Sequence, residues 1–352
     1  MGREVTGAAD IPAARLRERV ARVAVRGLTY RYYHWDWGEA VAVEGLWAAW
    51  RITGERRFFD FVRRMVEGWM AHSPDPWYPD HVGPGRTLLD LWEETGDLCF
   101  LGYARRLGEH LIHLPRAACG GYFHRPDLPD RARMIWVDSM QTDAPFLCRL
   151  GAATGEGRWY DAAAGHIAGH IAALQNPATG LFYHNYDDAR GRVNGVFWGR
   201  GNGWAALGLV HTLELLPKDH AGYAGILKGL ERLAEAILAR QDEETGLWRT
   251  VVDRPETYLE GSVSLMFANA LMRGGRAGAL SAECARAGER AWGALWDQVT
   301  PDGLVKNVSH RTPPREDPAD YTLPPVGGLY PWGQGPYLLT AATWLEGEGQ
   351  QG

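Results

Sequence analysis

The stretch most suited to chemistry is VFWGRGNGWAALGLV, residues 196–210. It places Trp198, Arg200 and Trp204 among alternating glycines, where a ligand can approach the backbone closely. An arginine binds a carboxylate through two parallel hydrogen bonds, and a tryptophan face suits the apolar face of a sugar ring. The stretch therefore predicts a site for an acidic sugar. The alternative is that Arg200 is buried and paired with an internal acid.

The apolar run after this stretch predicts a helix over 203–216, with Asn202 as its N-cap. Such a cap places the arginine and the tryptophans at a helix N-terminus, where free backbone N–H groups favour anions.

Two aspartates could supply acid–base chemistry. Asp138, in MIWVDSMQTDAPFL, follows an apolar run beside Trp136, and a desolvated carboxyl there would have a raised pKa and act as a general acid. It could equally form a capping box with Gln141, which needs no catalysis. Asp80, in DHVGPGRTLLDL, is either a turn residue or the second carboxylate of an acid–base pair.

Two histidines stand at matching places in successive Gly–aromatic loops, His124 in GGYFHRPD and His184 in TGLFYHNYDD. Isolated histidines are usually structural or solvated, but in such a loop they could donate hydrogen bonds to a substrate. The chain contains no HExxH, paired CxxC, phosphate-binding glycine loop or GxSxG motif. We therefore expect no metal and no cofactor.

The composition narrows the class further. The 352 residues carry a net charge of −6 with scattered basic residues, which argues against a nucleic-acid partner. Sixteen tryptophans, many beside Gly, Asp or His, favour a carbohydrate-binding cleft. The four cysteines lack paired spacing and are expected to be reduced. With no apolar run long enough for a membrane span and no signal-like segment, we expect a cytoplasmic location and no membrane partner.

Two sequence landmarks recur along the chain and indicate repeated αα-hairpins. Helical runs end three times in a Thr-Gly turn, at Thr53-Gly54, Thr95-Gly96 and Thr154-Gly155. A second set of glycine turns lies at Gly121, Gly180, Gly246 and Gly303, and a short strand-like segment follows each turn. These turns recur roughly every sixty residues, a period typical of repeat architectures.

About six such hairpins fill the chain, which predicts an all-α (α/α)6 barrel with strand-like rim loops at one end. An open α-solenoid is the competing architecture. We expect one catalytic domain over 1–352, with loose termini at 1–10 and 347–352. The proline-rich segment 309–325 is expected to be a long irregular loop near the leaving-sugar side.

Several motifs together resemble glycoside hydrolase family 105, the unsaturated rhamnogalacturonyl hydrolases, from about Trp35 to about Tyr337. They are, besides FWGRGNGW and WVDSM, the segments LFYH, GPGRTLLDLWEETGD, LEGSVSLMFANAL and YPWGQGPYLL. The resemblance implies an (α/α)6 barrel that removes a 4,5-unsaturated uronic acid from the non-reducing end of lyase-generated oligosaccharides. It also implies an unusual reaction, in which an aspartic acid protonates C4, water adds at C5, and the resulting hemiketal opens and expels the remaining sugar.

The resemblance assigns roles residue by residue. Asp138 matches the catalytic aspartate, and Asp80 matches the second aspartate. The sugar-lining positions match His184, Trp198, Arg200 and His124, and from the local pattern we add Trp204, Trp37 and Asn202 as substrate-binding residues.

The chain departs from the family pattern in three places. Trp37 stands where a tyrosine is usual, Gln141 and Thr142 replace an aromatic and a methionine, and the stretch between His124 and Asp138 is longer. These departures leave the unsaturated uronyl unit and the leaving sugar open. Two other functions stay open from the residues: a sugar epimerase of the N-acylglucosamine 2-epimerase type, which would use histidines such as His124 and His184, and a non-catalytic carbohydrate-binding protein.

Overall fold

The computed structural model describes residues 11–72 and 79–348. The chain is mostly helical, with short strands in the loops at one end. The helices are α1 (Ala13–Gly27), α2 (Trp37–Thr53), α3 (Arg56–His72), η2 (Pro79–Val82), α4 (Gly85–Thr95), α5 (Leu98–Ile112), α6 (Ser139–Thr142), α7 (Ala144–Thr154), α8 (Gly157–Leu174), α9 (Gly199–Leu215), α10 (Tyr223–Leu238), α11 (Gly261–Arg276), α12 (Ala282–Leu295), η3 (Pro318–Thr322) and α13 (Pro331–Glu348). The strands are β1 (Met134–Trp136), β2 (Asn185–Asp187) and β3 (Arg192–Val193).

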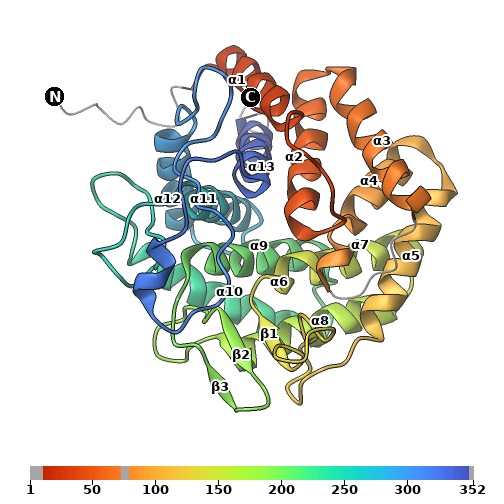
Figure 1. Ribbon diagram of the computed structural model, residues 1–352, viewed down its shortest axis with the longest axis vertical. Helices are drawn as coiled ribbons and strands as arrows, with labels where there is room; N and C mark the ends of the chain where they lie inside the picture. Colours follow the sequence, from red (N-terminus) through yellow and green to blue (C-terminus); the bar gives the residue numbers. More distant parts are fainter. Residues whose placement is uncertain (1–10, 73–78, 349–352) are drawn as a thin grey trace.

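The helices form a closed ring. The inner helices α2, α4, α7, α9, α11 and α13 each contact the next, and α13 contacts α2 again. An outer helix follows each of the first five along the chain, while α1 packs outside α13 and α2. Figure 1 shows this closure, with the C-terminal helix α13 beside the N-terminal helices α1 and α2. The (α/α)6 barrel is thus confirmed and the open solenoid is wrong, because a solenoid leaves its two ends apart.

Glycines let the two ends of the ring approach closely. A Cβ atom added to Gly335 on α13 would lie 2.3 Å from the carbonyl oxygen of Val41 on α2, and one added to Gly45 would lie 2.7 Å from the Cα atom of Gly335. Side chains at these two positions would therefore force the helices apart.

The predicted Thr-Gly turns end their helices as expected. Gly54, Gly96 and Gly155 are C-caps with φ of 73°, 71° and 71°, the left-handed region that glycine adopts without strain. At the first turn, the Thr53 hydroxyl donates to the Ala49 carbonyl and accepts from the Glu55 N–H, so the threonine satisfies groups that the helix end leaves free.

The rim loops contain short antiparallel pairings. The bridges Arg116–Tyr122, Gln175–Phe182 and Val299–Val305 follow hairpin ends, and β1, β2 and β3 form a three-stranded sheet in that order. In the predicted turns, Gly180, Gly246 and Gly303 have left-handed φ. In the first loop the glycine with left-handed φ, at 98°, is Gly120, which directly precedes Gly121.

Three other local predictions differ in their outcome. Helix α9 begins at Gly199, so Asn202 lies inside its first turn and is not an N-cap. Helix α13 continues to Glu348, so residues 347 and 348 are helical rather than loose, while residues 1–10 and 349–352 lie outside the described residues. The segment 309–325 is irregular as predicted, apart from the short η3.

No helix among the described residues has the length and apolarity needed to cross a bilayer.

Candidate active site

Asp138 lies between the end of β1 and the start of α6, in the sequence position expected of a capping residue. Its side chain caps no N–H group, so the capping-box interpretation is wrong. The residue is 8% exposed, and its burial raises the pKa to about 7, against a smaller lowering by the charge of Arg200. A carboxyl with this pKa keeps its proton in about half of the molecules at neutral pH and can act as a general acid.

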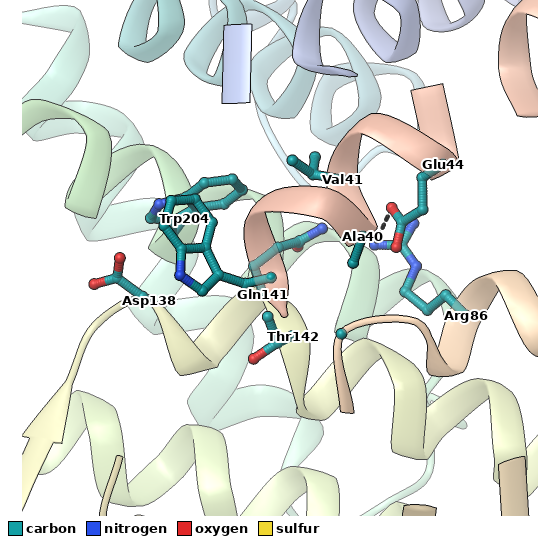
Figure 2. A pocket seen from close by; sticks show the side chains of 10 residues that line it. Ala40, Val41, Glu44, Arg86, Asp138, Gln141, Thr142 and Trp204 are labelled. Carbon is teal, nitrogen blue, oxygen red and sulfur yellow. Dashed lines mark ion pairs between the residues drawn. The ribbon is translucent and has the colours of Figure 1, made fainter. Parts of the chain in front are cut away.

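The cavity beside Asp138 extends inward between α2, α4 and α9. It is lined by Trp37 and Trp204, whose rings meet edge to face at 5.7 Å. Figure 2 shows Asp138 at one side of this cavity and the ion pair of Glu44 with Arg86, at 3.4 Å, at the other. The structure thus brings two predicted tryptophans and the predicted acid to one cavity.

His184 lies against Asp138. Its Nε2 atom is 3.6 Å from Oδ2 of Asp138, and its ring stacks on Trp198 at 4.3 Å. Burial holds the pKa of His184 well below its usual range, so the imidazole is neutral.

The hydroxyl of Tyr321 determines which nitrogen of His184 carries the hydrogen. It accepts from the N–H of Arg315 at 3.0 Å and from Nδ2 of Asn194 at 3.1 Å. Its own hydrogen is then directed to Nδ1 of His184 at 2.8 Å, which is a closer acceptor than the Arg315 carbonyl at 3.4 Å. We assign the remaining hydrogen to Nε2, which faces Asp138.

A second carboxyl–histidine pair lies nearby. Nε2 of His124 is 3.5 Å from Oδ2 of Asp80, which sits in η2. Burial raises the pKa of Asp80, and the charges of Asp36, Asp138 and Asp143 raise it further. Burial lowers the pKa of His124 to about 3.

Trp136 joins the two pairs. Its ring stacks on His124 at 4.4 Å and meets His184 edge to face at 5.8 Å. From the sequence, Trp136 was expected only to shield Asp138 from water. Its contact with both histidines was not predicted.

Arg200 is engaged inside the protein. It is 1% exposed, and its terminal nitrogens donate to six groups on five residues: Glu260 at 3.5 Å, Ser262, the carbonyl and hydroxyl of Ser309, the carbonyl of His310, and Thr312. Its guanidinium carbon lies 4.6 Å from the centre of the Trp198 ring. The structure therefore favours the internal ion pair over direct contact with a carboxylate.

Asn202 is also internal. Its side chain accepts from the N–H of Phe182 at 2.8 Å and donates to the carbonyls of Phe182 and Trp198, each at 2.9 Å. It therefore fixes the loop that carries His184 to the start of α9.

Three side chains near Asp138 were not predicted from the sequence. Tyr321 belongs to the irregular segment 309–325, where no periodicity marks a functional residue. His166 and His170 on α8 are fully buried and reach the Asp138 loop, with His166 Nε2 3.3 Å from the Ser139 carbonyl and His170 Nε2 3.2 Å from the Trp136 carbonyl. Their spacing of four residues on a helix was the one available signal.

A closed ring of helical hairpins with two buried carboxyl groups at one end defines a barrel-type carbohydrate-active enzyme. The family model for Glycosyl Hydrolase Family 88 matches residues 18–346. The chain is 31% identical over 318 residues to the unsaturated rhamnogalacturonyl hydrolase YesR of Bacillus subtilis, covering 89% of this chain and 90% of that one. The chain therefore belongs to the glycoside hydrolases of the family 88/105 group, as the sequence motifs predict.

Solved structures agree with the fold. A possible family 105 member from Salmonella enterica superposes with a TM-score of 0.88 at 22% identity, covering 96% of both chains. The unsaturated glucuronyl hydrolase of Bacillus sp. GL1 gives a TM-score of 0.74 at 18% identity, covering 94% of this chain and 96% of that one. The comparisons favour a hydrolase over the sugar epimerase.

Proposed function

We propose that this protein removes a 4,5-unsaturated uronic acid from the non-reducing end of an oligosaccharide, with Asp138 as the acid. The observation that carries this proposal is the position of Asp138. Its protonated carboxyl borders a cavity lined by Trp37 and Trp204, and a neutral histidine faces its second oxygen. Related proteins with curated activities, among them YesR, are named for unsaturated uronyl substrates.

In the first step Asp138 donates its proton to C4 of the enol ether. Positive charge then develops at C5 and the ring oxygen. Asp138 becomes a carboxylate, which the Nε2–H of His184 and the positive charge of Arg200 stabilise.

In the second step the Asp138 carboxylate takes a proton from the water that adds at C5. The resulting hemiketal opens to a C5 ketone, and the C1 centre then expels the leaving sugar as an alcohol. No covalent bond to the enzyme forms, so one carboxyl serves both steps. We assign to Asp80, whose burial raises its pKa, the role of a hydrogen-bond donor to the substrate.

The binding residues follow from the same geometry. Trp37 and Trp204 contact the apolar face of the uronate ring in the inner cavity. Trp198 and Asn202 hold His184 in place, and Arg200 acts on the site through its charge rather than by contact.

The experiment gives the protein an unsaturated uronyl disaccharide and follows the ultraviolet absorbance of the conjugated double bond. Wild type should consume the absorbance and Asp138→Asn should not, while Asp161→Asn, at an exposed carboxyl paired with His220, serves as the matched control. In D2O the product should gain one deuterium at C4. Epimerised sugar with an intact double bond, or binding without turnover by wild type, would overturn the proposal.

We also propose that the protein acts in the cytoplasm. Its four cysteines, Cys99, Cys119, Cys148 and Cys284, form no disulfide, as a reducing compartment would require. Fractionation of the source cells tests this location, and recovery of the protein in the culture medium would contradict it.

A further inference from the structure

A second pocket lies on the rim sheet, outside the barrel. In the sheet register Trp136 is opposite Asn185, Met134 is opposite Asp187, and Asp187 is opposite Arg192. Directly opposed residues project to the same face, so these side chains share one face of the sheet. Residues 313–316 line a pocket together with that face.

The pocket is positively charged although the protein is acidic. Four arginines line it, Arg131, Arg190, Arg192 and Arg315. Two acids, Asp187 and Glu316, line it as well, so the lining carries two net positive charges in a chain whose net charge is −6. A positive pocket in a negative protein attracts anions locally.

The acids in the lining have structural partners. Asp187 accepts from the N–H groups of Ala189 and Arg190 and pairs with the Arg190 side chain at 2.7 Å, so it holds the β2–β3 turn. Glu316 pairs with Arg192 at 2.7 Å across the pocket mouth. Within residues 11–72 and 79–348, the Arg315 side chain has no ion pair, which leaves its planar fork of donors for a ligand.

This pocket adjoins the residues that contact Asp138. Trp136 lines it and also contacts His184, and Asn185 follows His184 in the chain. The Tyr321 hydroxyl bonds both His184 and Asn194, another lining residue. The inner cavity at Asp138 runs toward the barrel axis, whereas this pocket lies at the rim. An enzyme that removes a terminal unit takes that unit inward, so the remaining sugars extend toward the rim.

We infer that this arginine-lined pocket binds an anionic group on the leaving oligosaccharide, either a sulfate ester or the carboxylate of a second uronic acid. Both groups present oxygens that match the guanidinium fork. The inference rests on the proposed function, since it extends the same substrate beyond the terminal ring. It narrows the substrate class to oligosaccharides that carry a second negative charge.

The test compares three substrates with the same unsaturated terminal ring. The first has a neutral leaving sugar, the second a sulfated one, and the third a leaving trisaccharide that contains a uronate. Wild type should prefer one or both charged substrates in kcat/KM by about tenfold or more, the size expected from a charge-assisted hydrogen bond. A preference for the sulfated substrate indicates that the pocket binds sulfate, and a preference for the uronate-containing substrate indicates that it binds a carboxylate. Either preference should become smaller at high salt.

The variant Arg192→Gln/Arg315→Gln should lose most of this preference, whereas Arg63→Gln, at an exposed arginine on α3, should keep it. Calorimetry on Asp138→Asn with the same three oligosaccharides reads the charge preference without turnover. If wild type turns over none of the substrates, the proposed function fails. The calorimetry still tests this inference separately, because binding to Asp138→Asn needs no turnover. Equal affinity for the three oligosaccharides, or a preference that survives in the double variant, would overturn the inference.

Discussion

The Nε2 atom of His184 lies 3.6 Å from the Oδ2 atom of Asp138, and each atom is buried with no hydrogen-bond partner among the described residues. The distance is slightly too long for a hydrogen bond. Because the Nε2–H faces Oδ2, we expect the acidic proton on Oδ1. Loss of that proton should draw the two groups together, because the N–H of His184 binds a carboxylate more strongly than a neutral acid.

The reaction should slow as the pH rises above about 7. Burial raises the pKa of Asp138 to about 7, and only the protonated form can donate to carbon. Above that pKa the protonated fraction falls about tenfold per pH unit, so kcat/KM should fall with the same slope. A pH–rate profile measures this, and a rate that stays constant to pH 9 would show that Asp138 is not the acid.

Asp138→Asn should be more stable than wild type at alkaline pH. The folded pKa of about 7 exceeds the ordinary value of 3.8, so between these pH values the folded state binds more protons than the unfolded state. Stability is therefore lost as the pH rises through this window, by about 1.4 kcal/mol per unit of raised pKa, and asparagine avoids that loss.

Urea unfolding at pH 4 and pH 8 tests this prediction. The stability of the variant relative to wild type should be greater at pH 8 than at pH 4. An equal stability difference at the two pH values would contradict the raised pKa of Asp138.

Arg200 should matter for stability more than for substrate contact. In Arg200→Met, Glu260 keeps a buried charge without its partner, which should cost about 3–5 kcal/mol of unfolding free energy. Adding Glu260→Gln should recover part of that loss, because the uncompensated charge is removed. Thermal or urea unfolding measures both variants. A normal stability with a raised KM in Arg200→Met would instead place the guanidinium on the substrate carboxylate.

The sequence predicted the ring well because its signals are local. A Thr-Gly helix end such as Thr53-Gly54 depends on a few adjacent residues, so it is readable without the fold. The predicted cap at Asn202 was wrong because the start of α9 is set by pairing across the fold, where the N–H of Gly199 bonds the Thr250 carbonyl.

The site was predictable in its residue types and less so in its contacts. Asp138 and His184 were found from motifs, yet Tyr321, which orients His184, lies 137 residues away in an irregular segment. Arg200 shows the same limit, since Glu260 and Ser309 reach it only through the closed ring. Contacts between segments this distant leave no pattern in a single sequence.

His170 should be a positioning residue for Asp138. Its Nδ1 and Nε2 atoms lie 2.9 Å and 3.2 Å from the carbonyls of His166 and Trp136, and a neutral ring donates to one of them at a time. In His170→Phe the Trp136 carbonyl loses its polar contact with the ring, and the Asp138 loop can shift. A displacement of about 1 Å can lower kcat up to about a hundredfold, whereas KM should change less because the cavity lining is untouched.

The conservative variant His170→Gln keeps an N–H donor and should restore part of kcat, which distinguishes positioning from simple filling of the core. His220→Phe, at a histidine outside the site, is the control and should behave as wild type. The measurements are kcat, KM and the melting temperature of each variant. If kcat falls in His170→Gln and His170→Phe only in proportion to the melting temperature, His170 stabilises the fold and does not position Asp138.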